Sequence, residues 1–297
     1  MANAFQHPFT KTAKRRRAAG GAGTSNRRHE GTLCSQNNCI IPSWRGLMAA
    51  SKATSRTLSV TTPTGRNSVR GPSGLVQRLL RATIHFFSYH LVMRRRSAWR
   101  TRVAGLQFVV RPTVFHPGYF ISSERFVQFI DRLDLRGKRV LDVGTGSGIL
   151  AIAAARSGAP NVIATDINPN AALSVPENAQ TNGVRAQIQP VCMDLLSGFA
   201  AGPRFDVIFA NLPKHNKQPR DLADRGWHSG PQHRDIAPFF EQAYERLGLG
   251  GCLYVMLSSH SDLDVIESLI SLAGFQWKII QRYPIFIESF VLYECRR

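Results

Sequence analysis

The chain has 297 residues and a formal net charge of +19, which is very unevenly distributed. Residues 1–104 contain 19 lysines and arginines against one acid, for a charge of +18, whereas residues 105–297 contain 19 against 18 acids, for +1. The high pI therefore gives no reason to expect nucleic-acid binding by the second part. Five cysteines without any Cys-x-x-Cys spacing argue against a disulfide framework or a zinc site, so no metal is expected.

Residues 1–72 are rich in Arg, Ser, Thr, Gly and Asn and have no sustained apolar period. Such a segment cannot bury enough apolar surface to offset its ordering entropy, so we expect a basic, disordered, low-complexity leader. Three alternatives stay open: an arm that contacts nucleic acid or an acidic partner, a targeting peptide, or a natural start at Met48 or Met93. No secretory signal pattern is visible, which favours a cytoplasmic protein.

Residues 73–120 predict an accessory element of one helix and short strands that borders the active site. Five apolar side chains fall on one face of the predicted helix: Val76, Leu80, Ile84, Phe87 and Leu91. A helix lying on a membrane surface, flanked by the arginines at 94–96, is the alternative. The apolar run over residues 79–93 is too short to span a bilayer, so no transmembrane segment is expected.

Residues 121–297 predict an α/β domain, because short apolar strands alternate with helices. Strands are expected at 139–143, 161–166, 187–192, 205–210 and 252–259, and helices at 149–158, 169–182, 235–248 and 262–273, the last capped by Ser261. Two more strands, at 276–282 and 288–294, follow without a helix between them and require an antiparallel pair around a Tyr283-Pro284 turn. Together these seven strands predict a mostly parallel sheet with an antiparallel pair at its end.

An apolar strand runs into three alternate glycines, Gly144, Gly146 and Gly148, that open a helix. Because glycine lacks a Cβ, the chain can turn sharply there and a ligand can lie against backbone amides at the helix N-terminus. A dinucleotide fingerprint needs its third glycine where Ile149 stands. The run from Asp142 through Thr145 to Gly148 instead resembles the first motif of class I S-adenosylmethionine (SAM)-dependent methyltransferases. The resemblance implies a Rossmann-like sheet and SAM as cofactor.

Two acids stand at later strand ends. Asp166 ends the second strand, where this topology places an acid beside a ribose, and Ile167 could pack on the adenine. Alternatively, Asp166 is the N-cap of the next helix, or Asp166 and Asn168 divide the ribose-binding and capping roles between them. The resemblance further implies that Asp194 receives the adenine amine and that Leu195 contributes backbone, against the alternative of a solvated turn aspartate.

The sequence Asn211-Leu-Pro-Lys214 ends the fourth strand, at the sheet edge where ligands bind. It resembles the Asn-Pro-Pro-Tyr motif of methyltransferases that modify planar nitrogens. In that motif an asparagine side chain and a neighbouring backbone carbonyl align the acceptor nitrogen with the sulfonium methyl, so Asn211 and Pro213 are the expected catalytic residues. Leu212 and Lys214 depart from the motif where the first proline and the acceptor-stacking aromatic stand.

Two further segments resemble release-factor glutamine methyltransferases of the HemK/PrmC-like family. Residues 117–124 resemble the segment before their domain, which implies that Ser123 and Glu124 lie near the cofactor, and residues 227–235 resemble a glycine-rich loop. Residues 214–234 are expected to form a substrate lid. The candidate substrate contacts are Phe115, Ser123, Glu124, Lys214 and Trp227.

These motifs predict a SAM-dependent methyltransferase that transfers a methyl group to a nitrogen, as a planar amide or an amine, of a protein, nucleobase or small molecule. One alternative is a small-molecule (secondary-metabolite) methyltransferase. The other is a nucleic-acid-binding protein whose basic leader makes the contact and whose methyltransferase-like domain is inactive.

Overall fold

The structure is a computed structural model, which describes residue 83 and residues 97–119, 121–285 and 288–297. The expected leader and, apart from Thr83, the expected helix near residues 76–91 lie outside the described residues. The following description concerns the described residues of the unit Ser68–Arg297.

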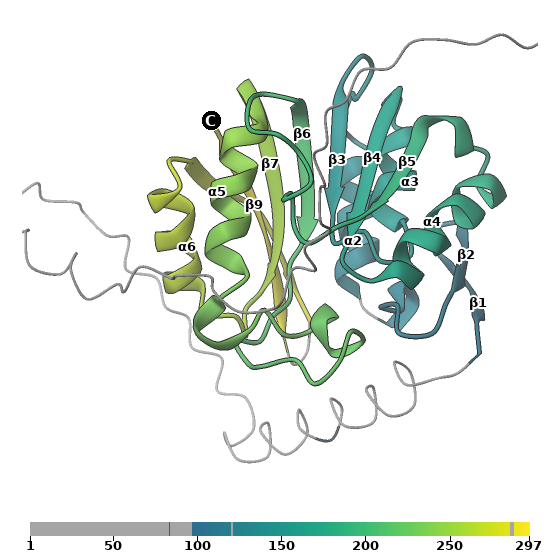
Figure 1. Cartoon of the computed structure of the whole chain (residues 1–297), viewed down its shortest axis with the longest axis horizontal. Helices are drawn as coiled ribbons and strands as arrows, with labels where there is room; N and C mark the ends of the chain where they lie inside the picture. The colour runs from purple at the N-terminus through teal and green to yellow at the C-terminus, as the bar shows by residue number, and fades with distance from the viewer. Residues whose placement is uncertain (1–82, 84–96, 120, 286–287) are drawn as a thin grey trace, which may run out of the picture. The chain divides into compact units, whose positions relative to one another are not determined.

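A seven-stranded sheet with the order β5-β4-β3-β6-β7-β9-β8 forms the centre of this unit (Figure 1). Strands β3 to β7 run parallel, and β9 is antiparallel to both of its neighbours, so the expected α/β fold class is confirmed. The strands are β3 (Arg139–Val143), β4 (Asn161–Asp166), β5 (Ile188–Cys192), β6 (Phe205–Asn211), β7 (Leu247–Ser258), β8 (Gln276–Pro284) and β9 (Ser289–Arg296).

The strand order reverses between β3 and β6. In this sheet the first strand along the sequence is β3, and the next two, β4 and β5, are added on one side of it. The following strand, β6, pairs with β3 on its other side. At such a switch point the loops after the two central strands separate and leave a crevice outside their carboxyl ends. The glycine turn follows β3, and Asn211 ends β6, so both lie at this crevice.

Helices cover both faces of the sheet, because side chains alternate between the faces along each strand. Val140 belongs to a core that also contains residues of α2, α3 and α4, whereas Leu141 belongs to a second core with α5 and α6. The helices are α2 (Ile121–Ile130), α3 (Ile149–Arg156), α4 (Pro169–Thr181), α5 (Ile236–Arg246) and α6 (Leu263–Leu272), with 3-10 turns at Pro117–Tyr119, Arg185–Gln187, Asp224–Gly226 and Pro231–His233. No helix in the described part of the chain is long and apolar enough to cross a membrane.

Two local predictions are wrong. The N-cap position of α6 is held by Asp262 rather than Ser261, and the Asp262 side chain makes no capping bond, since its carboxylate accepts from Asn216 and contacts His233. Strand β8 continues through Pro284, two residues beyond the expected end, so the chain reverses after the expected Tyr283-Pro284 turn, with Ile285 and Glu288 bonded through their backbones. At α6, a contact from a distant segment overrides the local signal.

A two-stranded antiparallel hairpin, β1 (Trp99–Val103) and β2 (Leu106–Val110), lies beside α4 (Figure 1). Two asparagine side chains, one on α4 and one at its C-cap, hydrogen-bond to the backbone of β2 as a neighbouring strand would. Asn178 accepts from the Val109 amide at 2.7 Å and donates to its carbonyl at 3.0 Å, and Asn182 makes the same pair of bonds with Gln107. Asn178 also donates to the Ser147 carbonyl at 2.9 Å, which ties the hairpin to the glycine turn.

Candidate active site

The three glycines of the turn all have positive φ, at +70°, +55° and +89° for Gly144, Gly146 and Gly148. Other residues rarely adopt this backbone conformation, so the turn requires glycine. A Cβ added to Gly144 or Gly146 would meet nothing within 4 Å, whereas one on Gly148 would meet Val175 Cγ2 at 3.2 Å. The first two glycines therefore leave open space for a ligand, and the third allows α3 to approach α4 closely.

Asp142, predicted as a cofactor-binding residue, lies behind the turn and is not among the residues that line the cavity. Its Oδ2 accepts from Thr145 Oγ1 at 2.6 Å and from the Ala151 amide at 3.0 Å, which joins the turn to the first turn of α3. Burial raises the pKa of this carboxyl to about 7. Its role in the structure is to hold the shape of the turn.

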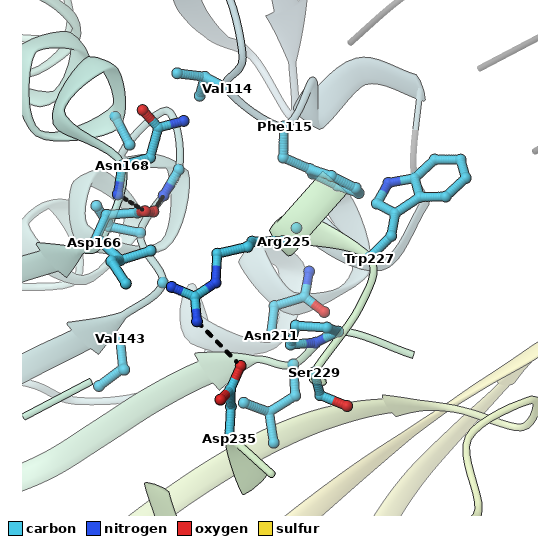
Figure 2. A pocket seen from close by; sticks show the side chains of 18 of the residues that line it. Val114, Phe115, Val143, Asp166, Asn168, Asn211, Arg225, Trp227, Ser229 and Asp235 are labelled. Atoms are coloured by element: carbon cyan, nitrogen blue, oxygen red, sulfur yellow. Dashed lines mark hydrogen bonds and ion pairs between the residues drawn. The ribbon is translucent and has the colours of Figure 1, made fainter. Parts of the chain in front are cut away.

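Asp166 accepts a hydrogen bond from the Gly146 amide at 2.9 Å and another from the Asn168 amide at 2.8 Å (Figure 2). Burial raises the pKa of Asp166 above its ordinary value, against the effect of these backbone bonds. Asn168 is the residue that caps α4, because its side chain accepts from the Asn170 amide. The two possible roles of Asp166 are thus divided: Asn168 is the cap, and Asp166 stays at the cavity wall.

One cavity brings together most of the predicted site residues. Its walls include Phe115, Ser123, Gly144, Thr145, Gly146, Asp166, Ile167, Asp194, Leu195, Asn211, Pro213, Lys214 and Trp227. The structure leaves Asp142, Gly148 and Glu124 outside these walls. It adds Val114, Ser122, Arg225 and Asp235, none of which was among the predicted site residues.

Two wall residues hold a strained backbone. Leu195 and Thr113 have φ values of +49° and +66°, in the left-handed region that costs a non-glycine residue about 1–2 kcal/mol. Strain of this kind persists where surrounding contacts fix it, and it concentrates at functional sites. No hydrogen bond among the described residues engages the carboxylate of Asp194, which stays available to accept one.

Asn211 faces the start of α2. Its Nδ2 donates to Ser122 Oγ at 3.2 Å. Among the described contacts its Oδ1 has no hydrogen-bond donor, so that oxygen can accept an N–H from a ligand. The strand end and α2 together set the position of this amide.

The loop between β6 and α5, expected to be a lid, is held by internal bonds. The backbones of His215 and His228 form an isolated parallel bridge, through the Trp227 carbonyl and the Ser229 amide. The Arg225 side chain extends across the view of Figure 2 to Asp235, with a contact of 3.4 Å. No group of three His, Cys, Asp or Glu side chains suited to a metal ion occurs within the described ranges.

A doubly wound sheet with this glycine turn, an acid at the end of β4 and an asparagine at the end of β6 has the class I methyltransferase fold. The T. thermophilus 16S rRNA methyltransferase RsmC, solved with AdoMet and guanosine, matches with a TM-score of 0.51 and 24% identity. The match covers 68% of this chain and 50% of that chain. At this identity the likeness shows the fold alone.

Residues 121–214 match the family model described as Ribosomal protein L11 methyltransferase (PrmA). The ribosomal protein L11 methyltransferase of Geobacter sulfurreducens is 52% identical over 77 residues, which are 26% of this chain and 24% of that protein. The enzyme of that name from Actinobacillus succinogenes is 46% identical over 98 residues, or 33% of this chain and 32% of the relative. The chain thus spans about a quarter to a third of these relatives.

The matched segment contains the glycine turn, Asp166, Asp194 and the Asn211-Leu-Pro-Lys214 sequence. The expected resemblance to class I SAM-dependent methyltransferases is therefore supported. The narrower resemblance to HemK/PrmC-like glutamine methyltransferases is not confirmed, because the model that matches describes a different methyltransferase family.

Proposed function

We propose that this chain is a SAM-dependent methyltransferase that methylates an amino nitrogen of a protein. The observation that carries the proposal is the joint placement of the open glycine turn, Asp166 and Asn211 in one cavity. These groups come from three separate strand ends, and the fold brings them together at the crevice where open α/β sheets bind ligands.

The shape of the turn fits SAM. A Cβ at Gly144 or Gly146 would project into empty space, so the backbone there offers a cradle that only a ligand fills. Asp166 stands beside this cradle, bonded to the Gly146 amide, where its carboxylate can accept ribose hydroxyl protons. We assign the adenine end to Ile167, Asp194 and Leu195, which line the same cavity.

Bound SAM supplies a methyl group on a sulfonium, with a neutral thioether as the leaving group. The chain's own task is then alignment and desolvation of the acceptor, which attacks as the neutral amine after its ammonium form has released a proton to solvent. Asn211 Oδ1 accepts an N–H of the acceptor nitrogen and directs the nitrogen lone pair, while Ser122 holds the amide in that orientation. We assign the carbonyl of a neighbouring residue, with Pro213 shaping the chain there, as the second acceptor.

A protein amine is favoured over a nucleobase or a small molecule by the match of residues 121–214 to the family of ribosomal protein L11 methyltransferases. The departure at Lys214, which cannot stack on a planar acceptor as an aromatic ring does, points the same way. The basic leader could add contacts with a nucleic-acid-containing partner such as a ribosome.

Two measurements test the proposal. S-adenosylhomocysteine at 100 times its Kd should stabilise the full chain by about 2.7 kcal/mol, and NAD should not. Asp166→Ala should abolish this stabilisation, whereas Asp134→Ala, at an exposed aspartate paired with Arg136, should retain it. Normal binding by Asp166→Ala would refute the ribose assignment.

The acceptor is tested with methyl-labelled SAM and three separate substrates: ribosomal protein L11, ribosomal RNA and a small-molecule fraction. Label in the protein, on an amine, supports the proposal. Label in RNA or in small molecules alone, with cofactor binding intact, would refute the acceptor class and leave the methyltransferase assignment in place.

A further inference from the structure

Lys214 is held in a corner at the acceptor end of the cavity. Its Nζ lies 3.1 Å and 3.2 Å from the two carboxylate oxygens of Glu288, and 5.7 Å from the ring centre of Trp227. Lys214, Trp227 and Ser258 line the cavity, whereas Glu288 lies behind them with its side chain 9% exposed. The ammonium group therefore lies close to both a nearly buried carboxylate and the ring of an indole.

The corner is built independently of Lys214. Ser258 Oγ donates to Glu288 and accepts from the His260 amide at 3.0 Å, and His260 Nδ1 lies 3.8 Å from the same carboxylate. Ser258 ends β7 and Glu288 precedes β9, so two paired strands fix the carboxylate. Trp227 comes from a separate segment, the loop between β6 and α5.

A carboxylate together with the face of a tryptophan is the combination that binds alkylammonium groups, through an ion pair and a cation–π contact. A nearly buried carboxylate left without a cation is strongly unfavourable. A ligand can replace Lys214 here only if it brings a positive charge of its own. The charge balance of the corner thus selects for a cation and against a neutral acceptor.

We propose that Glu288, Ser258 and Trp227 form a binding subsite for a primary alkylammonium group, and that Lys214 occupies this subsite until a cationic substrate side chain displaces it. The inference rests on the proposed function, since it gives the acceptor end of that cavity a specificity for positively charged protein side chains. Lys214 is then an internal competitor for the substrate.

The test measures binding of n-butylammonium chloride to the full-length protein saturated with S-adenosylhomocysteine, by ligand-observed NMR. Lys214→Met removes the competing ammonium group from the corner and should bind the probe about tenfold or more tightly than the native chain. Lys217→Met removes a lysine of the same loop that has no ion pair among the described residues, and it should bind as the native chain does. Adding Glu288→Gln to Lys214→Met should remove the gain.

Neutral n-butanol distinguishes a cation site from an apolar slot. Equal gains for n-butanol and n-butylammonium in Lys214→Met would overturn the proposal, as would equal n-butylammonium binding by the native chain and Lys214→Met. If Lys214→Met does not fold, Lys214→Gln keeps a donor for Glu288 and should still bind the probe more tightly than the native chain. The assay needs no methyl transfer, so a chain that binds the cofactor analogue and methylates another acceptor would leave this result interpretable.

Discussion

The buried Asp142 carboxyl should make the stability of this protein depend on pH in a direction opposite to that of a typical ion-paired aspartate. The side chain is fully buried, its Oδ1 has no partner among the described residues, and burial raises its pKa from 3.8 to about 7. The folded state therefore holds a proton that the unfolded state has released. The stability that this proton contributes is complete below pH 3.8 and is lost as the pH rises through about 7.

The magnitude follows from the size of the shift. About three pKa units at about 1.4 kcal/mol each correspond to about 4 kcal/mol between the two limits. Asp142→Asn keeps an acceptor for Thr145 and Ala151 but cannot ionise. Relative to the native chain, the free energy of unfolding of the variant should rise by about 1.4 kcal/mol per pH unit from pH 5 towards 7 and level off above it.

Urea unfolding of both proteins at half-unit intervals from pH 5 to 8 measures this difference, and most other titrating groups cancel. The Coulombic repulsion from Asp166, which helps to raise the pKa of Asp142, is absent in the variant together with the titrating group and does not reverse the sign. Asp134→Asn is the matched control, because Arg136 lowers the pKa of Asp134 to about 2 and no slope should appear in this range. A flat or falling difference for Asp142→Asn would refute the reasoning.

Three further outcomes are expected. Asn211→Ala should keep the Kd for S-adenosylhomocysteine within about threefold while lowering single-turnover methyl transfer by about 100-fold, and equal losses in both would contradict an aligning role. Asn178→Ala removes three hydrogen bonds of a buried side chain and should lower the urea-derived unfolding free energy by about 2–3 kcal/mol. Asn182→Ala, at the more exposed of the two asparagines that bond to β2, should lower it by less than about 1 kcal/mol. Equal effects of the two substitutions would contradict the role of Asn178 in connecting the hairpin to the glycine turn. Gly148→Ala should cost about 1–3 kcal/mol in the same assay, because its φ is +89° and Val175 lies at 3.2 Å, and an unchanged midpoint would argue against close packing there.

The sequence by itself determined the sheet and the position of its crevice. Strand periodicity placed β3 and β4 at the residues where they occur, and the glycine spacing separated this turn from a dinucleotide fingerprint. These signals are local: they depend on side-chain alternation, on the absence of a Cβ and on the handedness of βαβ units. The order of the strand ends along the chain then brought Asp166 and Asn211 to one edge.

Only the tertiary structure decided which of these residues line the cavity, which cap a helix and which pair with one another. Asp142 faces the interior because α3 packs over it, and Asn168 rather than Asp166 caps α4. The partner of Lys214 is Glu288, 74 residues further along the chain, and no periodicity connects the two. Contacts of this kind depend on which loops meet at a sheet edge, which is settled by the packing of the whole domain and not by the propensity of any one segment.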